Sequence, residues 1–150
     1  MKKKIIILDY GSGNIKSVLN ICKHLDENSE ISNDVNKIKN CSHLILPGVG
    51  SFGSSIEKIK KNLPIDEILN EINIQKKSFL GICVGMQVMA TKGFEFGEHD
   101  GLNLIEGTVE KLKTDKLPLP NIGWGNIKLN NNEGIFSNLN NENYFYLRLF

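Results

Sequence analysis

Residues 44–53 read Leu-Ile-Leu-Pro-Gly-Val-Gly-Ser-Phe-Gly, and this stretch decides the fold. It joins the predicted strand Ser42–Leu46, with its apolar run Leu44–Leu46, to the glycine-rich turn Pro47–Gly53. An uninterrupted apolar run of this length is typical of a strand that is buried on both faces of a sheet. A helix is expected from about Ser54, because Ser54 and Glu57 have the spacing of a capping box. The segment therefore predicts a strand, a glycine turn and a helix, in that order.

The same pattern occurs again on each side of this stretch. Towards the N-terminus, the apolar run Lys4–Asp9 leads into the glycine turn Tyr10–Asn14. The helix expected after that turn has an apolar stripe at helical spacing, made of Ile15, Val18, Leu19, Cys22 and Leu25. Towards the C-terminus, Ser78–Leu80 leads into the turn Gly81–Gly85. A third helix is expected there, formed by Met86, Val88, Met89 and Ala90.

Strands that alternate with helices imply parallel crossover connections. Residues 1–100 therefore predict an α/β fold with a doubly wound, mostly parallel sheet. Its glycine turns are expected to gather at the carboxyl ends of the strands, where such folds bind ligands. The segment 102–129 has a different pattern, which favours hairpins or edge strands. The length of 150 residues predicts a single domain over 1–150.

The composition excludes several classes of function. The 18 basic and 17 acidic residues leave a net charge of +1, so neither nucleic acid nor an anionic membrane surface is expected as a partner. The apolar runs are far shorter than the roughly 20 residues that a membrane-spanning helix needs. The N-terminus also lacks the pattern of a signal peptide, so we expect a cytoplasmic protein. Three widely spaced cysteines form neither a disulfide framework nor a paired metal motif, and no metal or cofactor is predicted.

Cys83 is the strongest candidate for a nucleophile. It lies in Gly81-Ile82-Cys83-Val84-Gly85, the form of a nucleophile elbow, in which flanking glycines permit a strained turn from strand to helix. At a helix N-terminus, the dipole and the unpaired N–H groups favour a thiolate and can hold a developing oxyanion. Cys22 and Cys41 have no such setting and are expected to be buried or incidental. On spacing alone, a small residue packed at a tight turn would explain Cys83 equally well.

Four motifs in a fixed order carry a family resemblance. They are Asp9–Asn14, Pro47–Gly53, Gly81–Gln87 and Pro120–Trp124, the last reading Pro-Asn-Ile-Gly-Trp. With these motifs the chain resembles the class I, or triad-type, glutamine amidotransferases, and within them the glutaminase subunits of imidazole glycerol phosphate synthases. The resemblance extends from about residue 4 to residue 146. It implies a flavodoxin-like form of the α/β fold.

The resemblance also implies a substrate and a reaction. In this family a cysteine hydrolyses glutamine, so Cys83 would attack the side-chain amide, form a thioester and release ammonia before water frees glutamate. Backbone N–H donors for the oxyanion are implied at Gly48, Val49, Gly50 and Val84. Gln87, one helical turn after Cys83, matches the position that helps to bind glutamine.

A partner is implied as well. In this family a (β/α)8-barrel synthase subunit docks over the site, and the ammonia passes through the barrel to a nucleotide-derived substrate; the products feed histidine and purine synthesis. Asn14 and Trp124 match positions at or near the docking face, so we assign them to the partner interface of a heterodimer. Asn121 stands where the family usually has histidine. This departure leaves open another ammonia acceptor, a sugar aminated in surface glycan synthesis.

The base of the family's triad has no counterpart among the matched positions. The three histidines, His24, His43 and His99, all lie outside the family's C-terminal His-Pro-x-Glu motif. His99 is more typical of a loop histidine than of a substitute base, so we assign no catalytic base.

The last residues depart from the family too. After Tyr146 the family continues with an apolar pair and His-Ser, whereas this chain reads Leu147–Phe150 and includes its only arginine, Arg148. These features favour the hypothesis of a shifted reading frame or an interrupted gene, with the C-terminal strands of the sheet missing. A further interpretation is then open: a truncated subunit that docks to the synthase without hydrolysing glutamine.

Overall fold

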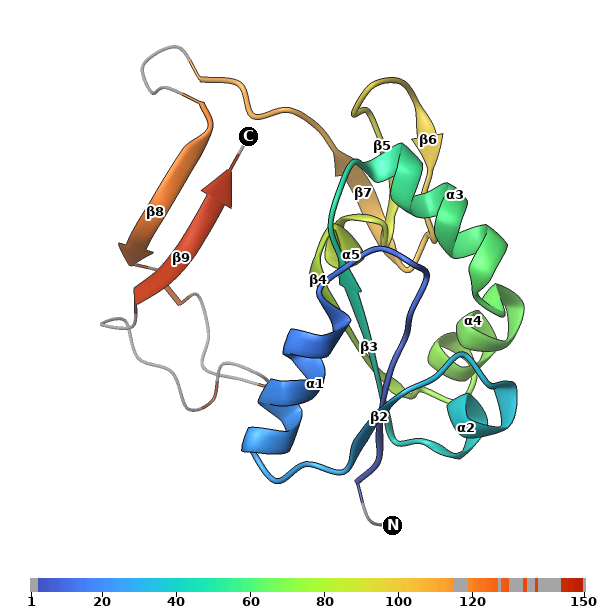
Figure 1. Cartoon of the computed structure of the whole chain (residues 1–150). Coiled ribbons are helices and arrows are strands. Elements are labelled where there is room, and N and C mark those ends of the chain that lie inside the picture. Colours follow the sequence, from blue (N-terminus) through green and yellow to red (C-terminus); the bar gives the residue numbers. More distant parts are fainter. Residues whose placement is uncertain are drawn as a thin grey trace. The chain divides into compact units, whose positions relative to one another are not determined.

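The computed structural model describes residues 3–114, 119–126, 128–129, 134, 137 and 144–149. The chain divides into two compact units, Met1–Glu110 and Lys111–Phe150 (Figure 1). Each unit is described by itself below. The expectation of a single domain over 1–150 stays a prediction.

A four-stranded parallel sheet forms the centre of the first unit. Its strands are β1 (Ile5–Ile7), β2 (Ser29–Ile31), β3 (His43–Gly48) and β4 (Ser78–Cys83), in the order β2-β1-β3-β4. The three apolar runs of the sequence thus form β1, β3 and β4, and the predicted parallel α/β sheet is confirmed. The segment that forms β2 has no apolar run, and sequence reasoning gave it no assignment.

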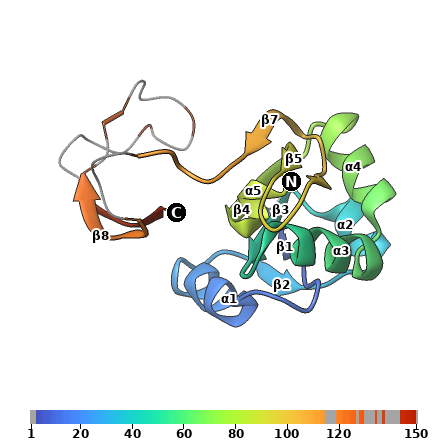
Figure 2. The same ribbon diagram turned by 90° about the horizontal axis from the view of Figure 1, so that it is seen from above.

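Helices cover both faces of this sheet. They are α1 (Ile15–His24), α2 (Val35–Asn40), α3 (Phe52–Asn62), α4 (Ile65–Asn73) and the short α5 (Val84–Gln87). Figure 2 shows α1 on one side of the sheet and α2, α3 and α4 on the other. Covering both faces is the mark of a doubly wound sheet, so this prediction is also confirmed.

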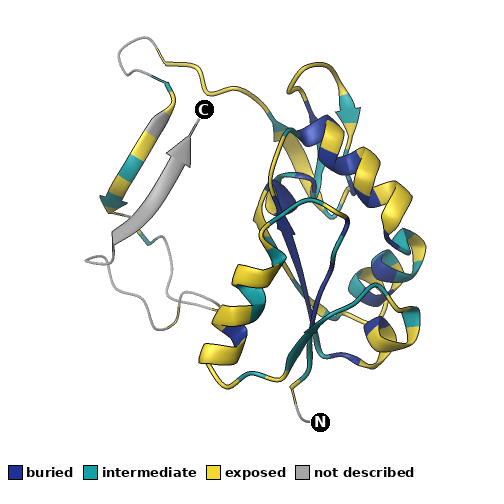
Figure 3. Ribbon diagram, viewed as in Figure 1, coloured by how far each residue is buried: buried dark blue, intermediate teal, exposed yellow. Residues whose placement is uncertain are grey.

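The strands supply the core with residues that alternate between the two faces. Ile6, Leu8, Leu44 and Leu46 belong to the larger apolar cluster, under α2, α3 and α4. Ile7 and Ile45 belong to a smaller cluster, which α1 covers with Cys22 and its neighbours. Figure 3 shows this buried centre between exposed outer helix faces. The predicted stripe of α1 is correct up to Cys22 but wrong for Leu25, which is 65% exposed because the helix ends at His24.

The capping box predicted at Ser54 is wrong. Helix α3 begins at Phe52, its N-cap is Ser51, and no side chain of its own caps it. Instead the carboxylate of Glu95 accepts a hydrogen bond from the backbone N–H of Phe52 at 2.8 Å. An acidic group at a helix N-terminus satisfies a free donor and interacts favourably with the dipole. This cap lies 43 residues away in sequence, so a local pattern could not reveal it.

The helix expected after Cys83 is much shorter than predicted. Helix α5 ends at Gln87, and the chain then forms β5 (Ala90–Gly93), so Ala90 lies in a strand. With β6 (His99–Asp100) and β7 (Ile105–Val109), β5 makes a second sheet in the order β6-β5-β7. Strand β7 is an edge strand, as predicted for 102–129, and it pairs parallel with β5.

The second unit contains an antiparallel pair of strands. They are β8 (Asn121–Asn126) and β9 (Tyr144–Leu149). Strand β8 lies within 102–129, where the sequence predicts hairpins or edge strands, whereas its partner β9 lies outside that segment. In the part of the chain that the structure describes, no helix has the length and apolar character needed to cross a membrane.

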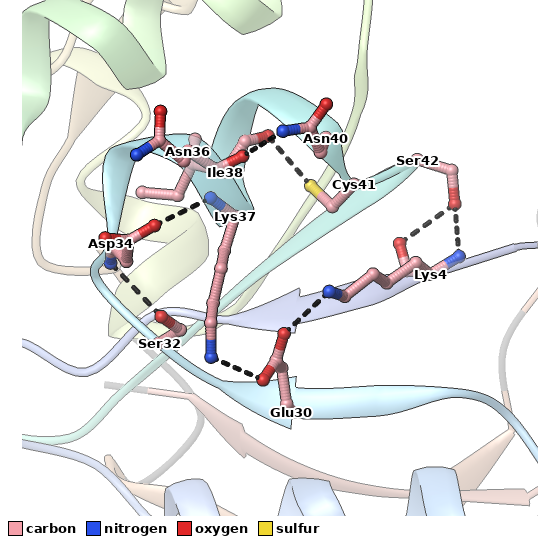
Figure 4. A network of polar contacts seen from close by, with 10 residues as sticks. All are labelled: Lys4, Glu30, Ser32, Asp34, Asn36, Lys37, Ile38, Asn40, Cys41 and Ser42. Atoms are coloured by element: carbon pink, nitrogen blue, oxygen red, sulfur yellow. Dashed lines mark hydrogen bonds and ion pairs between the residues drawn. The ribbon is translucent and has the colours of Figure 1, made fainter.

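A polar network ties the edge of the main sheet to its neighbours (Figure 4). The carboxylate of Glu30 on β2 pairs with Lys4 and Lys37, each at 2.8 Å. Hydrogen bonding to Lys37, and then to Lys4, lowers the pKa of Glu30. The backbone N–H of Lys4 donates to the hydroxyl of Ser42 at 2.8 Å, which links β1 to the start of β3. The short strand β2 is thus held in place by side chains as well as by its backbone pairing.

We expect Lys77→Met to destabilise the first unit by about 3–5 kcal/mol, because it leaves the carboxylate of Glu71 buried without a partner. Lys77 and Glu71 form an ion pair at 2.8 Å, and each side chain is only 8% exposed. The Lys77 ammonium also donates to the carbonyl of Ile38, near the end of α2, at 2.6 Å. Urea unfolding followed by circular dichroism measures the effect.

The matched control is Lys92→Met, which breaks an exposed ion pair between Lys92 and Glu98. Exposed pairs contribute little, so this variant should be destabilised far less than Lys77→Met. Equal losses in the two variants would contradict the importance assigned to the buried pair.

Candidate functional site

Cys83 lies where β4 ends and α5 begins. It is the N-cap of α5, with φ 56° and ψ −119°, and its side chain is exposed. A positive φ is costly for a residue with a side chain, and such strain is concentrated at functional turns. The structure therefore places the thiol on a strained strand-to-helix turn, open to solvent. Because α5 has only four residues, its dipole is far smaller than that of the longer helix expected from the sequence.

Glycines on both sides of Cys83 make this turn possible. A Cβ on Gly81 would lie 2.5 Å from the carbonyl oxygen of Gly85, and a Cβ on Gly85 would overlap the carbonyl oxygen of Leu46. Both distances are far below van der Waals contact, so only glycine fits at either position. The close approach brings the elbow directly against the end of β3.

The loop Pro47–Gly50 adjoins the elbow. Gly48 is the register partner of Cys83 in the β3–β4 pairing. A Cβ on Gly48 would lie 2.6 Å from the backbone nitrogen of Gly85, so the two turns are packed backbone to backbone. Gly50 has φ +112°, a conformation that favours glycine. The side chain of Val49 is 51% exposed.

The first glycine turn meets the same edge of the sheet. A Cβ on Gly13 would lie 3.2 Å from the carbonyl oxygen of Pro47. The hydroxyl of Ser12 donates to the carbonyl of Val49 at 3.4 Å. All three glycine turns thus gather at the carboxyl ends of β1, β3 and β4, which confirms that expectation from the sequence.

The other candidate residues have different surroundings. Val84 follows Cys83 directly and is buried, and Gln87 is the half-buried last residue of α5. Asn14 caps α1, because its side-chain oxygen accepts from the backbone N–H of Ser17 at 3.4 Å. Trp124 lies in the second unit, on β8, where its register partner is Tyr146. The roles in glutamine binding and partner docking that the resemblance implies for these residues stay predictions.

None of the three histidines has a described contact with Cys83. His24 is the exposed last residue of α1. The Nδ1 atom of His43 lies 2.8 Å from the hydroxyl of Ser42. The ring of His99 packs against α3, since a Cβ on Gly53 would lie 2.5 Å from it. The described residues also contain no group of three or more His, Cys, Asp and Glu side chains that could hold a metal ion.

Sequence reasoning missed one residue beside this site, Tyr10. Its side chain is fully buried, and its hydroxyl lies against Gly48, the register partner of Cys83. Burial raises the pKa of Tyr10. The sequence placed Tyr10 in a glycine turn, and no local pattern predicts that its ring reaches under the neighbouring loop.

A family model covers nearly the whole chain. The model described as "Glutamine amidotransferase class-I" matches residues 6–148. It spans both the strained elbow and the loop packed against it.

Individual curated relatives indicate which members of this family the chain is similar to. The chain is 39% identical over 148 residues to "Imidazole glycerol phosphate synthase subunit HisH" of Pelagibacter ubique, covering 95% of this chain and 71% of that protein. It is 39% identical over 146 residues to the subunit of the same name from Sulfurimonas denitrificans, covering 95% and 70%. It is 38% identical over 144 residues to that from Methanosarcina barkeri, covering 96% and 70%. By its strained cysteine elbow, its glycine loops and these matches, the chain belongs to the class-I glutamine amidotransferase family.

Proposed function

We propose that the protein is the glutaminase subunit of an imidazole glycerol phosphate synthase in histidine biosynthesis. It would hydrolyse glutamine to glutamate and ammonia and supply the ammonia to a synthase subunit. The observation that carries the proposal is the exposed, strained Cys83 packed beside the loop Gly48–Gly50. The relatives named above, all subunits of this synthase, support the choice of acceptor.

The chemistry begins at the thiol. The sulfur of Cys83 would attack the side-chain amide carbon of glutamine and form a tetrahedral intermediate with a negatively charged oxygen. Backbone N–H groups of Gly48, Val49, Gly50 and Val84 are the proposed donors to that oxygen, because Gly48 pairs with Cys83 across the sheet and Val84 follows Cys83 directly. The C–N bond then breaks, and ammonia leaves with a proton taken from the thiol by way of a base.

Water completes the cycle. It attacks the thioester carbon, the C–S bond breaks, and glutamate and the free thiol are released. Gln87, at the end of α5, is the proposed contact for the amino-acid part of the substrate. The two proton transfers need a base, and none of His24, His43 and His99 contacts Cys83 in the described part of the chain.

The proposed partner is a (β/α)8-barrel synthase subunit that docks over the site and receives the ammonia. Asn14 and Trp124 are the proposed contacts on this chain. Asn121 is the one residue that favours a different acceptor, an aminated sugar.

The test is glutamate release by the purified protein, alone and with the synthase subunit. Hydrolysis of glutamine but not of asparagine is expected, because the reacting amide must reach from the substrate-binding group to Cys83. Production of imidazole glycerol phosphate from glutamine identifies the acceptor. A folded protein that binds the synthase subunit yet releases no glutamate would leave only the docking role.

A further inference from the structure

Tyr10 contains a buried polar group for which the proposed reaction gives no role. Its side chain is 0% exposed and is part of the main apolar cluster. Its hydroxyl oxygen is buried and, among the described residues, has no hydrogen-bond partner of normal geometry. Phenylalanine would fill nearly the same space without burying an unpaired hydroxyl. Because native proteins leave few such groups unpaired, this hydroxyl needs an explanation.

The hydroxyl lies directly against the loop beside the nucleophile. A Cβ on Gly48 would be 2.7 Å from the Tyr10 oxygen. Burial raises the pKa of Tyr10, the hydroxyl of Ser55 and the backbone of Val49 lower it, and the charge of Cys83 raises it. Among the described residues, none of these groups forms a hydrogen bond of normal geometry with the phenol oxygen.

Gly48 is held by its pairing with Cys83 at the end of β3, but Val49 and Gly50 follow that strand and have few described polar contacts. Gly48 and Gly50 have no side chains, and the side chain of Val49 is 51% exposed. The described polar contact of Val49 on its other side is the 3.4 Å hydrogen bond from Ser12 to its carbonyl. The position of this part of the loop therefore depends on what packs against Gly48, including the Tyr10 hydroxyl.

We propose that the hydroxyl of Tyr10 is a positioning group for glutamine hydrolysis, which packs against Gly48 and so fixes the loop Gly48–Gly50 beside Cys83. The proposal rests on the proposed glutaminase function. Tyr10 itself does not touch the reacting atoms. It acts through the loop, because an oxyanion donor has to be held within about 0.5 Å of its productive position.

The variant Tyr10→Phe tests the proposal, because it removes the hydroxyl and keeps the ring. With glutamine and the synthase subunit present, kcat should fall about tenfold, since small displacements of a catalytic group have large effects on rate. The KM for glutamine should stay within about twofold of the wild-type value, because the substrate-binding contacts are unchanged. The melting temperature should stay equal or rise, because an unpaired buried hydroxyl is lost.

Ser29→Ala is the matched control. The Ser29 hydroxyl on β2 is the other buried side-chain oxygen without a partner in the described part of the chain. Its removal should leave kcat unchanged. A purely structural role for Tyr10 would instead lower the melting temperature and leave kcat at the wild-type value, and that result would overturn the proposal.

A second readout separates this proposal from the proposed function. A chloroketone analogue of glutamine alkylates the cysteine through an oxyanion-like transition state, whereas iodoacetamide needs no oxyanion donor. Tyr10→Phe should slow alkylation of Cys83 by the chloroketone about tenfold and leave the iodoacetamide rate unchanged. Wild-type protein that releases no glutamate would contradict the proposed function. Equal chloroketone rates in wild type and Tyr10→Phe would overturn the role of Tyr10.

Discussion

Replacing Cys83 by alanine should reduce glutamate release by about 10³-fold or more, because the reaction then has no nucleophile. Cys22→Ala and Cys41→Ala are the matched controls. Both thiols are buried, each with 7% of the residue exposed, and neither lies at a strained turn. They should keep wild-type kcat and lose only packing energy. Activity that survived in Cys83→Ala would contradict the assignment of the nucleophile.

Thiol reactivity gives an independent measurement of the same point. Iodoacetamide should label Cys83 first, because its side chain is exposed while Cys22 and Cys41 are buried. Burial raises the pKa of the Cys41 thiol, which further disfavours its reactive thiolate. Mass spectrometry of the digested protein locates the label. A protein labelled at Cys83 that releases no glutamate would keep the nucleophile without a working base, which matches the docking-only alternative.

The parts of the fold that sequence could predict are those with a local cause. Strands β1 and β3 contain short apolar runs buried on both faces, and the glycine turns at their ends require glycine for steric reasons. Strand β2 has no such pattern, because it lies at the edge of the sheet and is held partly by the ion pairs of Glu30. The start of α3 likewise depends on Glu95, a distant residue that no local motif includes.

The residues of the site also fall into two groups, those that a local motif reveals and those that only tertiary packing reveals. The elbow around Cys83 and the loop Gly48–Gly50 are visible as motifs, because each is a continuous stretch with its own backbone requirement. Their mutual contact, through the register pair Gly48 and Cys83, needs the sheet order β3–β4 to be known. The position of Tyr10 needs the packing of three turns at once. Residues that work through tertiary contact therefore appear only in the structure.

The elbow also predicts the most damaging small substitution in the first unit. Gly85→Ala should destabilise this unit by at least about 4 kcal/mol, or prevent folding, because there is no space for a methyl group. A Cβ at this position would overlap the carbonyl oxygen of Leu46, a backbone atom in the middle of the sheet. Relief would require β3 to move away from α5, and that movement would also separate Gly48 from Cys83. Gly85→Ala should therefore lower both the free energy of unfolding, measured in urea, and the rate of glutamate release.

Gly107→Ala is the control that separates lack of space from backbone strain. Gly107 has φ +144°, but a Cβ there would meet nothing within 4 Å. Its cost should be limited to backbone strain of about 1–2 kcal/mol, with activity retained. If Gly85→Ala instead folded as stably as Gly107→Ala, the close packing of the elbow against β3 would be wrong. The proposed placement of the oxyanion donors beside Cys83 would then lose its structural basis.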